Sequence, residues 1–331
     1  MAVSAAAVAG AGPVVRFHAA SLAGAGEAAA GDCFLTDDPQ HVDCLPSLIN
    51  IGAQKAGTGE IQQWLSVHPQ VHVHGGEVHF FDGVRGGRTR RCRSQSEAKR
   101  MRLKYARHLW RQKALSRSDV EHKLIFEKTP AYLDLASPAL VSCLVPATRL
   151  LLMLRMPVAR AVSSYDMCQL HSQLKHCSKP FHVAVAPYDL DGLPRFGEME
   201  RGNPRLYRLL HMGAYAHHIE RWLKHFPSKQ LRILWLEQFK ADPFRCMAAL
   251  ERFLGLRAIE YRDIATKGPT GLWVVGASKS ITERKFGPKP KLDQELNRTL
   301  HRFYEPWQER LRMVMAKHNL TLVHRPSPPL L

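Results

Sequence analysis

The sequence predicts a single α/β domain with a mainly parallel central sheet flanked by helices. Short apolar runs of a strand's length recur along the chain, and segments with helical periodicity separate them. This alternation is typical of parallel sheets whose crossover connections are helices. With 331 residues, of which 45% are hydrophobic, the chain can bury a large core. The sequence shows no internal repeat and no sign of a second domain.

The predicted strands are apolar at successive positions, as expected for strands buried on both faces. They cover residues 48–52, 124–127, 150–155 and 231–236. The predicted helices cover residues 58–67, 96–115, 157–170, 205–225, 242–254 and 292–317. The Pro- and Gly-rich stretch 179–204 is expected to be a surface insertion. In such folds ligands bind beyond the carboxyl ends of the strands, so functional residues are expected there.

The two ends of the chain carry little periodic signal. Residues 1–45 are rich in Ala and Gly, which predicts a disordered leader; residues 46–320 form the predicted domain, and residues 321–331 a C-terminal tail. A transit peptide is an alternative reading of the leader, which has few acids and a single basic residue, Arg16. No apolar run approaches the roughly 20 residues that span a bilayer, so no transmembrane segment is predicted.

The chain is strongly basic, with a formal net charge of +18 and a pI near 9.9. Such a charge suits a nucleic acid, an anionic membrane, a polyanionic glycan or an anionic cofactor. The basic segment 85–117 has two readings: a solvated loop and helix, or a patch for an acidic partner. Nucleic acid is disfavoured because no known binding module is present and stacking aromatics do not alternate with the basic residues.

The cysteines give no clear framework. There are seven, an odd number, and none form a CxxC pair. The pattern therefore predicts neither a disulfide framework nor a zinc site. A metal site made by Cys168, His171, His176 and Cys177 is the alternative, disfavoured because isolated thiols and solvated histidines are commoner in a His-rich chain.

The stretch INIGAQKAGTGEIQQWL, residues 49–65, is typical of a backbone cradle for an anion. A strand leads into a small-residue loop around Lys55, and a helix begins at Thr58. N–H groups of the loop and of the first helical turn converge on one spot, where the helix dipole also favours negative charge. Gly57 and Gly59 let the main chain approach a ligand closely. The lysine precedes Gly-Thr, so this is not the Walker arrangement of P-loop NTPases and kinases.

A second motif is RLLLMLRMPVARAVSSY, residues 149–165. Arg155 ends a buried strand, and Ser163 lies about two turns into the helix that follows. An arginine and a hydroxyl in this arrangement can bind a second phosphate together.

A third motif combines GEVHFFD, residues 76–82, with FEKTPAYL, residues 126–133. Glu77 and His79 share a face if their segment is extended, and Lys128 ends another strand at the same edge of the sheet. A carboxylate, an imidazole and lysines near one anion loop are the groups that deprotonate a hydroxyl and stabilise charge on a transferring group.

Together these motifs resemble the 3′-phosphoadenosine 5′-phosphosulfate (PAPS) dependent sulfotransferases, and specifically the heparan sulfate glucosaminyl 3-O-sulfotransferases. IGAQKAGTGEIQQWLSVHPQV is similar to the 5′-phosphosulfate loop of that branch, and EVHFFD and EKTPAYL match it almost letter for letter. LLLMLRMPVARAVSSY resembles the 3′-phosphate motif, with Met156 in place of the usual acidic residue. TKGPTGLW and ERKFGPKP resemble two late cofactor loops. The likeness spans roughly residues 46–318 and implies the P-loop-like sulfotransferase fold.

The resemblance implies a role for each matching position. The residues that would hold the 5′-phosphosulfate are Lys55, Ala56, Gly57, Thr58 and Gly59. Those that would bind the 3′-phosphate are Arg155 and Ser163. Those that would close over the nucleotide are Lys267, Gly268 and Lys285.

The resemblance also implies the catalytic groups. Glu77 would be the general base on the acceptor hydroxyl, with His79 and Asp82 beside it. Lys128 and Lys55 would neutralise charge on the bridging oxygen and the sulfuryl group, so that no metal is required.

The implied reaction moves a sulfuryl group from PAPS to a hydroxyl or amine of a carbohydrate such as a heparan-sulfate-like glycan. The alternatives are a sulfotransferase of small molecules or of protein tyrosine and, in another class, a polyanion-binding protein without catalysis. The family implies the Golgi lumen. The stretch 271–280 lacks the family's disulfide cysteines and no membrane anchor is evident, so a soluble cytoplasmic or organellar location is the alternative.

Overall fold

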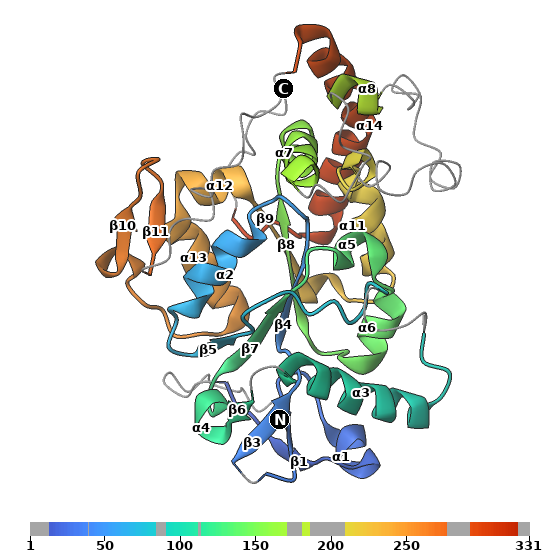
Figure 1. The fold of residues 1–331 in the computed structure, drawn as a ribbon, viewed down its shortest axis with the longest axis vertical. Coiled ribbons are helices and arrows are strands. Elements are labelled where there is room, and N and C mark those ends of the chain that lie inside the picture. The colour runs from blue at the N-terminus through green and yellow to red at the C-terminus, as the bar shows by residue number, and fades with distance from the viewer. Residues whose placement is uncertain are drawn as a thin grey trace, which may run out of the picture.

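A five-stranded sheet forms the centre of the computed structural model, which describes residues 13–38, 40–83, 91–111, 114–170, 181–185, 209–276 and 292–323 (Figure 1). The strand order is β5-β7-β4-β8-β9, and every neighbouring pair is parallel. The strands are β4 (Leu48–Gly52), β5 (Val71–Val73), β7 (Leu124–Lys128), β8 (Arg149–Leu154) and β9 (Leu231–Trp235). β4 and β7 are buried at every position. The predicted α/β class with a mainly parallel sheet is confirmed.

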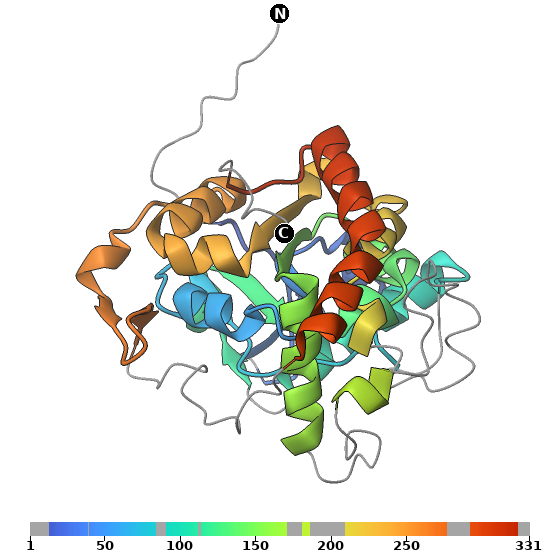
Figure 2. The same ribbon diagram turned by 90° about the horizontal axis from the view of Figure 1, so that it is seen from above.

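Helices lie on both sides of this sheet (Figures 1 and 2). One side carries α2 (Thr58–Ser66), α12 (Leu236–Ala241) and α13 (Pro243–Leu254). These three helices meet at Trp64, whose ring centroid lies 5.5 Å from that of Phe239 and 5.8 Å from that of Phe244. The edge-on arrangement of such rings adds to the stabilisation from burial.

The other side carries four helices: α5 (Tyr132–Leu135), α6 (Pro138–Leu144), α11 (Tyr215–Leu223) and α14 (Gln294–His318). Trp222 of α11 donates its indole N–H to the Leu133 carbonyl of α5 at 3.1 Å. α7 (Pro157–Leu170) follows β8 and packs with α8 (Phe181–Val185) and α14 around a second apolar cluster that includes Tyr165. The predicted helix over 157–170 matches α7. Most of the predicted insertion 179–204 lies outside the described residues.

Residues 17–44 are ordered, so the prediction of a disordered leader over 1–45 is wrong for this part. β1 (Phe17–Ala19), β2 (Cys33–Leu35), β3 (His41–Cys44) and β6 (Leu115–Ser116) form a four-stranded sheet beside α1 (Leu22–Glu27). Strands this short show no periodicity in sequence. The module is held instead by a Cys33–Cys44 disulfide and by buried Asp32, which accepts hydrogen bonds from Arg16 and the Ala29 N–H, each at 2.8 Å.

The prediction that the chain has no disulfide framework is also wrong. Besides Cys33–Cys44, a Cys92–Cys143 disulfide joins the segment before α3 (Gln95–Trp110) to α6. Cys168 is disulfide-bonded as well. The two described pairs are separated by 11 and 51 residues. Such pairs are brought together by the tertiary fold, which is why their spacing gives no signal.

The remaining elements are short. They are α4 (Arg117–Val120), two 3-10 turns (Ser228–Gln230 and Tyr261–Asp263), and the antiparallel hairpin of β10 (Ala265–Lys267) and β11 (Trp273–Val275). Thr321 bridges Ile233 of β9 in parallel, so the predicted tail 321–331 begins inside the fold. Among the described residues, no helix combines the length and apolarity needed to cross a bilayer.

Candidate active site at the carboxyl edge of the sheet

The loop from β4 to α2 has the backbone shape of an anion cradle. Lys55 and Gly57 adopt left-handed conformations, with φ of 68° and 85°. Gly57, the N-cap of α2, has no side chain with which to bond the first N–H groups of the helix. A Cβ at Gly57 would lie 2.5 Å from Cδ1 of Leu236, so both the backbone angle and the packing require glycine. The positive end of α2 therefore has the local geometry that suits an anion.

Two cations of the predicted cofactor site meet at this loop. Arg155, the residue after β8, donates from Nη1 to the Lys55 carbonyl at 3.2 Å. Burial lowers the pKa of Lys55, the charge of Arg155 lowers it further, and Asp166 opposes both effects. Burial also lowers the pKa of Arg155. Two partly buried cations that repel one another are stabilised by an anion placed between them.

Arg155 is held from its other side. Its carbonyl accepts the Tyr215 hydroxyl at 2.8 Å, which anchors the end of β8 to α11. The N–H of Met156 donates to Glu237 Oε1 at 3.2 Å. α7 then begins at Pro157 and carries Ser163, which is half-buried. The structure therefore orients Arg155 toward the loop and places Ser163 on the adjoining helix.

A cluster of four charged or titratable side chains forms next to this loop. Lys128 Nζ donates to Glu77 Oε1 at 3.2 Å, and His79 Nε2 lies 3.2 Å from Glu77 Oε2. His79 Nδ1 lies 2.5 Å from Asp82 Oδ2. The Asp82 side chain is fully buried, whereas that of Glu77 is 39% exposed. The sequence-predicted residues Glu77, His79, Asp82 and Lys128 are thus brought together, with the Glu77 carboxylate reachable from solvent.

The backbone conformation that brings these residues together differs from the prediction. Glu77 and His79 were expected to alternate along an extended segment, but residues 76–82 form no strand and His79 has a φ of 54°. The loop is shaped by hydrogen bonds from β7 and α5. Thr129 Oγ1 accepts the Val78 N–H at 2.9 Å and the His79 N–H at 3.4 Å, and the Tyr132 hydroxyl accepts the Phe80 N–H at 3.0 Å.

Glu127 is a residue that sequence reasoning missed. It lies in β7 with no exposed surface; it accepts a hydrogen bond from the Tyr105 hydroxyl at Oε1 and one from Thr129 Oγ1 at Oε2, the latter at 3.3 Å. Burial raises the pKa of Glu127 to about 8. A carboxyl within an otherwise apolar strand was the signal available, because an acid is rarely buried without a specific partner. Glu127 and Thr129 together form the support beneath the Glu77 loop.

Two residues predicted to close over the nucleotide, Lys267 and Gly268, lie on the β10–β11 hairpin. Lys267 is exposed, and its Nζ lies 5.4 Å from the ring centroid of Trp273. Gly268 donates its N–H to the Leu272 carbonyl at 2.9 Å. Trp273 in turn stacks edge-on with Phe244 of α13 at 5.0 Å, which fixes the hairpin to the helices on the α2 side of the sheet. Lys285 lies outside the described residues.

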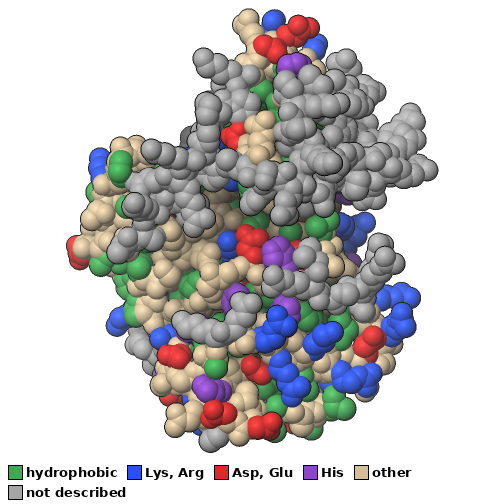
Figure 3. All heavy atoms as spheres, in the orientation of Figure 1, with side chains coloured by type: hydrophobic (Ala, Val, Ile, Leu, Met, Phe, Trp, Pro, Cys, Tyr) green, Lys and Arg blue, Asp and Glu red, His purple; other side chains and the backbone are tan. Residues whose placement is uncertain are grey.

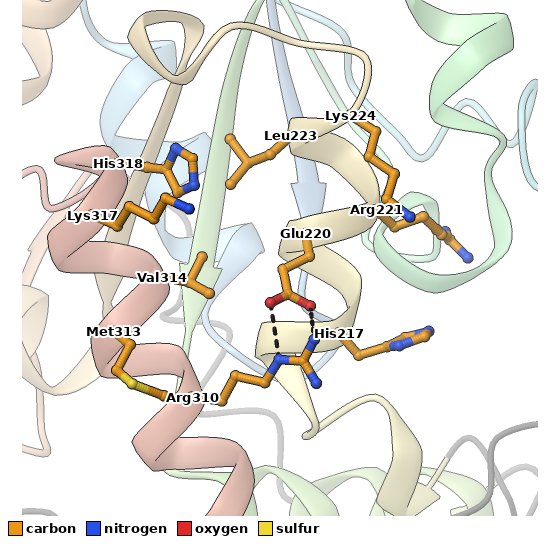
Figure 4. A pocket seen from close by; sticks show the side chains of 10 residues that line it. All are labelled: His217, Glu220, Arg221, Leu223, Lys224, Arg310, Met313, Val314, Lys317 and His318. Carbon is orange, nitrogen blue, oxygen red and sulfur yellow. Dashed lines mark hydrogen bonds and ion pairs between the residues drawn. The ribbon is translucent and has the colours of Figure 1, made fainter.

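A cavity of about 890 Å³ lies elsewhere, between α11 and α14 (Figure 4). Arg310 spans it with two hydrogen bonds to Glu220, one of 2.9 Å and one of 2.6 Å. None of the sequence-predicted site residues lines this cavity, whose walls come from the two helices. It is therefore separate from the strand-edge cluster.

Strand order explains why the predicted residues converge. Lys128 ends β7, the anion loop follows β4, and Arg155 follows β8, and these three strands are neighbours in the sheet. Lys128 pairs in register with Asn50, two residues before the end of β4. The residues present fit a nucleotide with two phosphate-type groups. The start of α2 lies beside two cations, Lys55 and Arg155, and the Glu77 carboxylate is paired with Lys128.

Comparison with known proteins gives one family over most of the chain. A model of the sulfotransferase domain matches residues 45–312. Human heparan sulfate glucosamine 3-O-sulfotransferase 3B1 is 28% identical over 277 residues, which cover 80% of this chain and 61% of that protein. Human heparan sulfate glucosamine 3-O-sulfotransferase 6 is 26% identical over 276 residues, which cover 80% of this chain and 70% of that protein. The aligned part spans about three fifths of the 3B1 relative.

Two further matches widen the comparison. The bifunctional heparan sulfate N-deacetylase/N-sulfotransferase 1 of Caenorhabditis briggsae is 26% identical, over 79% of this chain and 30% of that protein. Among solved structures, a sulfotransferase from Alicyclobacillus acidocaldarius superposes with a TM-score of 0.58 at 21% identity, covering 82% of this chain and 96% of that one. The predicted sulfotransferase fold is confirmed, and so is the predicted family. This chain belongs to the sulfotransferase family.

Proposed function

We propose that this protein transfers the sulfuryl group of PAPS to a hydroxyl or amine of a carbohydrate acceptor. The observation that carries the proposal is the convergence of three neighbouring strand ends on one site. β4 supplies the anion loop with Lys55, β8 supplies Arg155, and β7 supplies Lys128, which is bonded to Glu77. A binding site for an anionic donor thus lies next to a carboxylate that can accept a proton.

The chemistry divides among these groups. Glu77 takes the proton of the acceptor hydroxyl as the acceptor oxygen forms its bond to sulfur, and the bond from sulfur to the bridging phosphate oxygen breaks. Lys128 and Lys55 neutralise the charge that develops on that oxygen, which leaves with the adenosine 3′,5′-bisphosphate product. His79 holds Glu77 on one side and Asp82 on the other, which fixes the carboxylate for the transfer.

The carbohydrate acceptor is supported by the relatives. Three of them are named as heparan sulfate sulfotransferases, two acting at a 3-O position and one at nitrogen. A polyanionic glycan also suits the +18 charge of the chain. Transfer to a small molecule or to protein tyrosine is the competing assignment, and it uses the same donor site.

Sulfuryl transfer from radiolabelled PAPS to a panel of glycans, phenols and peptides tests the proposal. We expect label in a glycan, and we expect Lys55→Ala or Glu77→Gln to lower turnover at least about a hundredfold, since one donor at such a site is worth about 3–4 kcal/mol. Glu220→Gln, in the cavity between α11 and α14, is the control. Near-normal turnover by either site variant, or label only in phenols or peptides, would contradict the proposal.

A further inference from the structure

The outer face of α3 carries a row of four cations. Arg100, Lys104, Arg107 and Arg111 follow one another at spacings of four, three and four residues, and all four are exposed. At 3.6 residues per turn this spacing places them on one stripe of the helix, and a rise of 1.5 Å per residue extends that stripe over about 16 Å. Arg111, the C-cap, keeps helical angles, so the stripe continues to the end of α3.

Few acids neutralise the stripe. In the described part of the chain none of its four side chains is bonded to a carboxylate; Arg100 donates to the Ser96 hydroxyl at 2.9 Å. Glu97, the one acid within α3, is engaged at the start of the helix, where it accepts the Arg93 N–H at 2.7 Å. Burial raises the pKa of Asp43 and the charge of Arg107 opposes that rise, so half-buried Asp43 lies near one cation of the row.

The stripe adjoins the loop of residues 76–82, which carries Glu77. His108 lies beside it on the helix surface, four residues after Lys104 and three before Arg111. His108 donates from Nε2 to the Val78 carbonyl at 2.9 Å, and Val78 lies between Glu77 and His79 in the chain. Figure 3 shows Lys and Arg side chains gathered over α3, with acidic and histidine side chains nearer the centre of the same face.

Contacts on the inner face of α3 hold the helix, and with it this surface, in place. Tyr105 on the inner face bonds to buried Glu127, and Arg102 donates to the Leu144 carbonyl at 2.8 Å. The Cys92–Cys143 disulfide ties the segment before the helix to α6. Exposed cations on a fixed helix lose little conformational freedom of the backbone when an anion binds.

We propose that Arg100, Lys104, Arg107 and Arg111 hold the sulfated or carboxylated extension of a glycan chain whose reacting group lies at Glu77. The assignment rests on the proposed function and deepens it. A cation at every turn of a helix matches an acceptor that carries negative charge at repeated intervals. A single small acceptor at Glu77 has no use for charges spread over four helical positions.

Substitution of all four residues by Gln tests the proposal. The matched control is Arg298→Gln, Arg302→Gln, Arg312→Gln and Lys317→Gln, which removes four exposed charges from α14. The acceptors are a sulfated heparan-sulfate dodecasaccharide and a disaccharide from the same chain. We expect the α3 variant to lower the ratio of kcat/KM for the longer acceptor over the shorter about tenfold, since each exposed ion pair contributes modestly. The control variant keeps the wild-type ratio.

Direct binding separates this inference from the proposed function. The wild type should bind the dodecasaccharide more weakly as salt is raised, and the α3 variant should show a shallower salt dependence. If the wild type sulfates no glycan but binds it through α3, the proposed function fails and the docking surface stands. If glycan is sulfated and the two variants behave alike, the docking surface fails. Tighter binding of a single-stranded DNA dodecamer than of the dodecasaccharide would overturn the assignment to a glycan.

Discussion

One hydroxyl, that of Thr129, holds the loop that carries the proposed base. It accepts two main-chain N–H groups, those of Val78 and His79, and donates to Glu127. All of these groups are buried or half-buried, so water cannot replace a lost bond cheaply. The position of Glu77 therefore depends on the hydroxyl of Thr129, a residue with no exposed surface.

Thr129→Val removes the hydroxyl oxygen and keeps nearly the same side-chain shape. We expect it to leave two N–H groups without an acceptor, to destabilise the loop by about 1–3 kcal/mol and to lower kcat at least about tenfold. Affinity for adenosine 3′,5′-bisphosphate, measured by titration calorimetry, should stay within twofold because the anion loop is untouched. Thr129→Ser keeps the hydroxyl and should restore kcat. Equal loss by the Ser and Val variants would contradict the positioning role.

Glu127, which bonds to Thr129, makes the free energy of unfolding depend on pH. Its folded-state pKa of about 8 lies above the 4.5 of an unfolded glutamate, so the folded protein binds its proton more tightly. The stability that this proton contributes is full below about pH 4.5 and is lost as pH rises toward 8, at up to about 1.4 kcal/mol per pH unit.

Glu127→Gln keeps the shape and removes the titration. The free energy of unfolding of the wild type, measured in urea from pH 5 to pH 8, should fall relative to that of the Gln variant. Parallel profiles for the two proteins would show that Glu127 does not carry this proton.

At the scale of elements, the long buried strands and helices were predictable, and the short ones were not. β4 and α7 match their predicted ranges because a mainly apolar run of strand length, or a proline followed by helical periodicity, gives a clear signal. β5 and the strands of residues 17–44 have three or four residues each and give none.

The site was predictable for a different reason. Lys55, Arg155 and Lys128 each stand at or just after the end of a predicted strand, and parallel strands bring their carboxyl ends to one edge. The shape of residues 76–82 was not predictable, because it depends on Thr129 and Tyr132, about fifty residues away in the chain. Residues that act through a distant hydrogen bond leave no local pattern.

In the proposed function, the start of α2 binds the donor. Gly57→Ala forces an L side chain into a left-handed position and 2.5 Å from Leu236 Cδ1, so the loop or the Leu236 side chain must move. Gly255→Ala is the matched control: its φ is 67°, and a Cβ there meets nothing within 4 Å. Both should lose about 1–2 kcal/mol of stability from the backbone angle.

Only the Gly57 variant should lose affinity for adenosine 3′,5′-bisphosphate, by at least about tenfold. Thermal unfolding and titration calorimetry measure the two effects separately. Unchanged nucleotide affinity in Gly57→Ala would exclude this loop from the donor site.

At the scale of the whole molecule, one disulfide lies within the N-terminal module and another joins the segment before α3 to α6. Cys33–Cys44 closes β2 onto β3, and Cys92–Cys143 closes a stretch of 51 residues. We propose from these pairs that the protein folds in an oxidising compartment, where such bonds persist. The Ala- and Gly-rich composition of residues 1–45 concealed this module from sequence analysis.

Replacing Cys92 and Cys143 together by Ser should lower the free energy of unfolding by about 2–4 kcal/mol, because the closed loop is long. Denaturant unfolding of the double variant measures the loss, and peptide mapping without reductant checks the pairing. Unmodified thiols at these positions in protein isolated from its native source would contradict the proposed compartment.

The central claim is that the ends of β4, β8 and β7 hold a nucleotide donor and a base that are separable by mutation. The most direct measurement is nucleotide binding and single-turnover sulfuryl transfer, made on the same three proteins: the wild type, Arg155→Ala and Glu77→Gln. We predict that Arg155→Ala loses at least about tenfold in affinity for adenosine 3′,5′-bisphosphate. Glu77→Gln should bind it like the wild type and transfer at least about a hundredfold more slowly. Wild-type affinity in Arg155→Ala, or wild-type transfer in Glu77→Gln, would contradict the account.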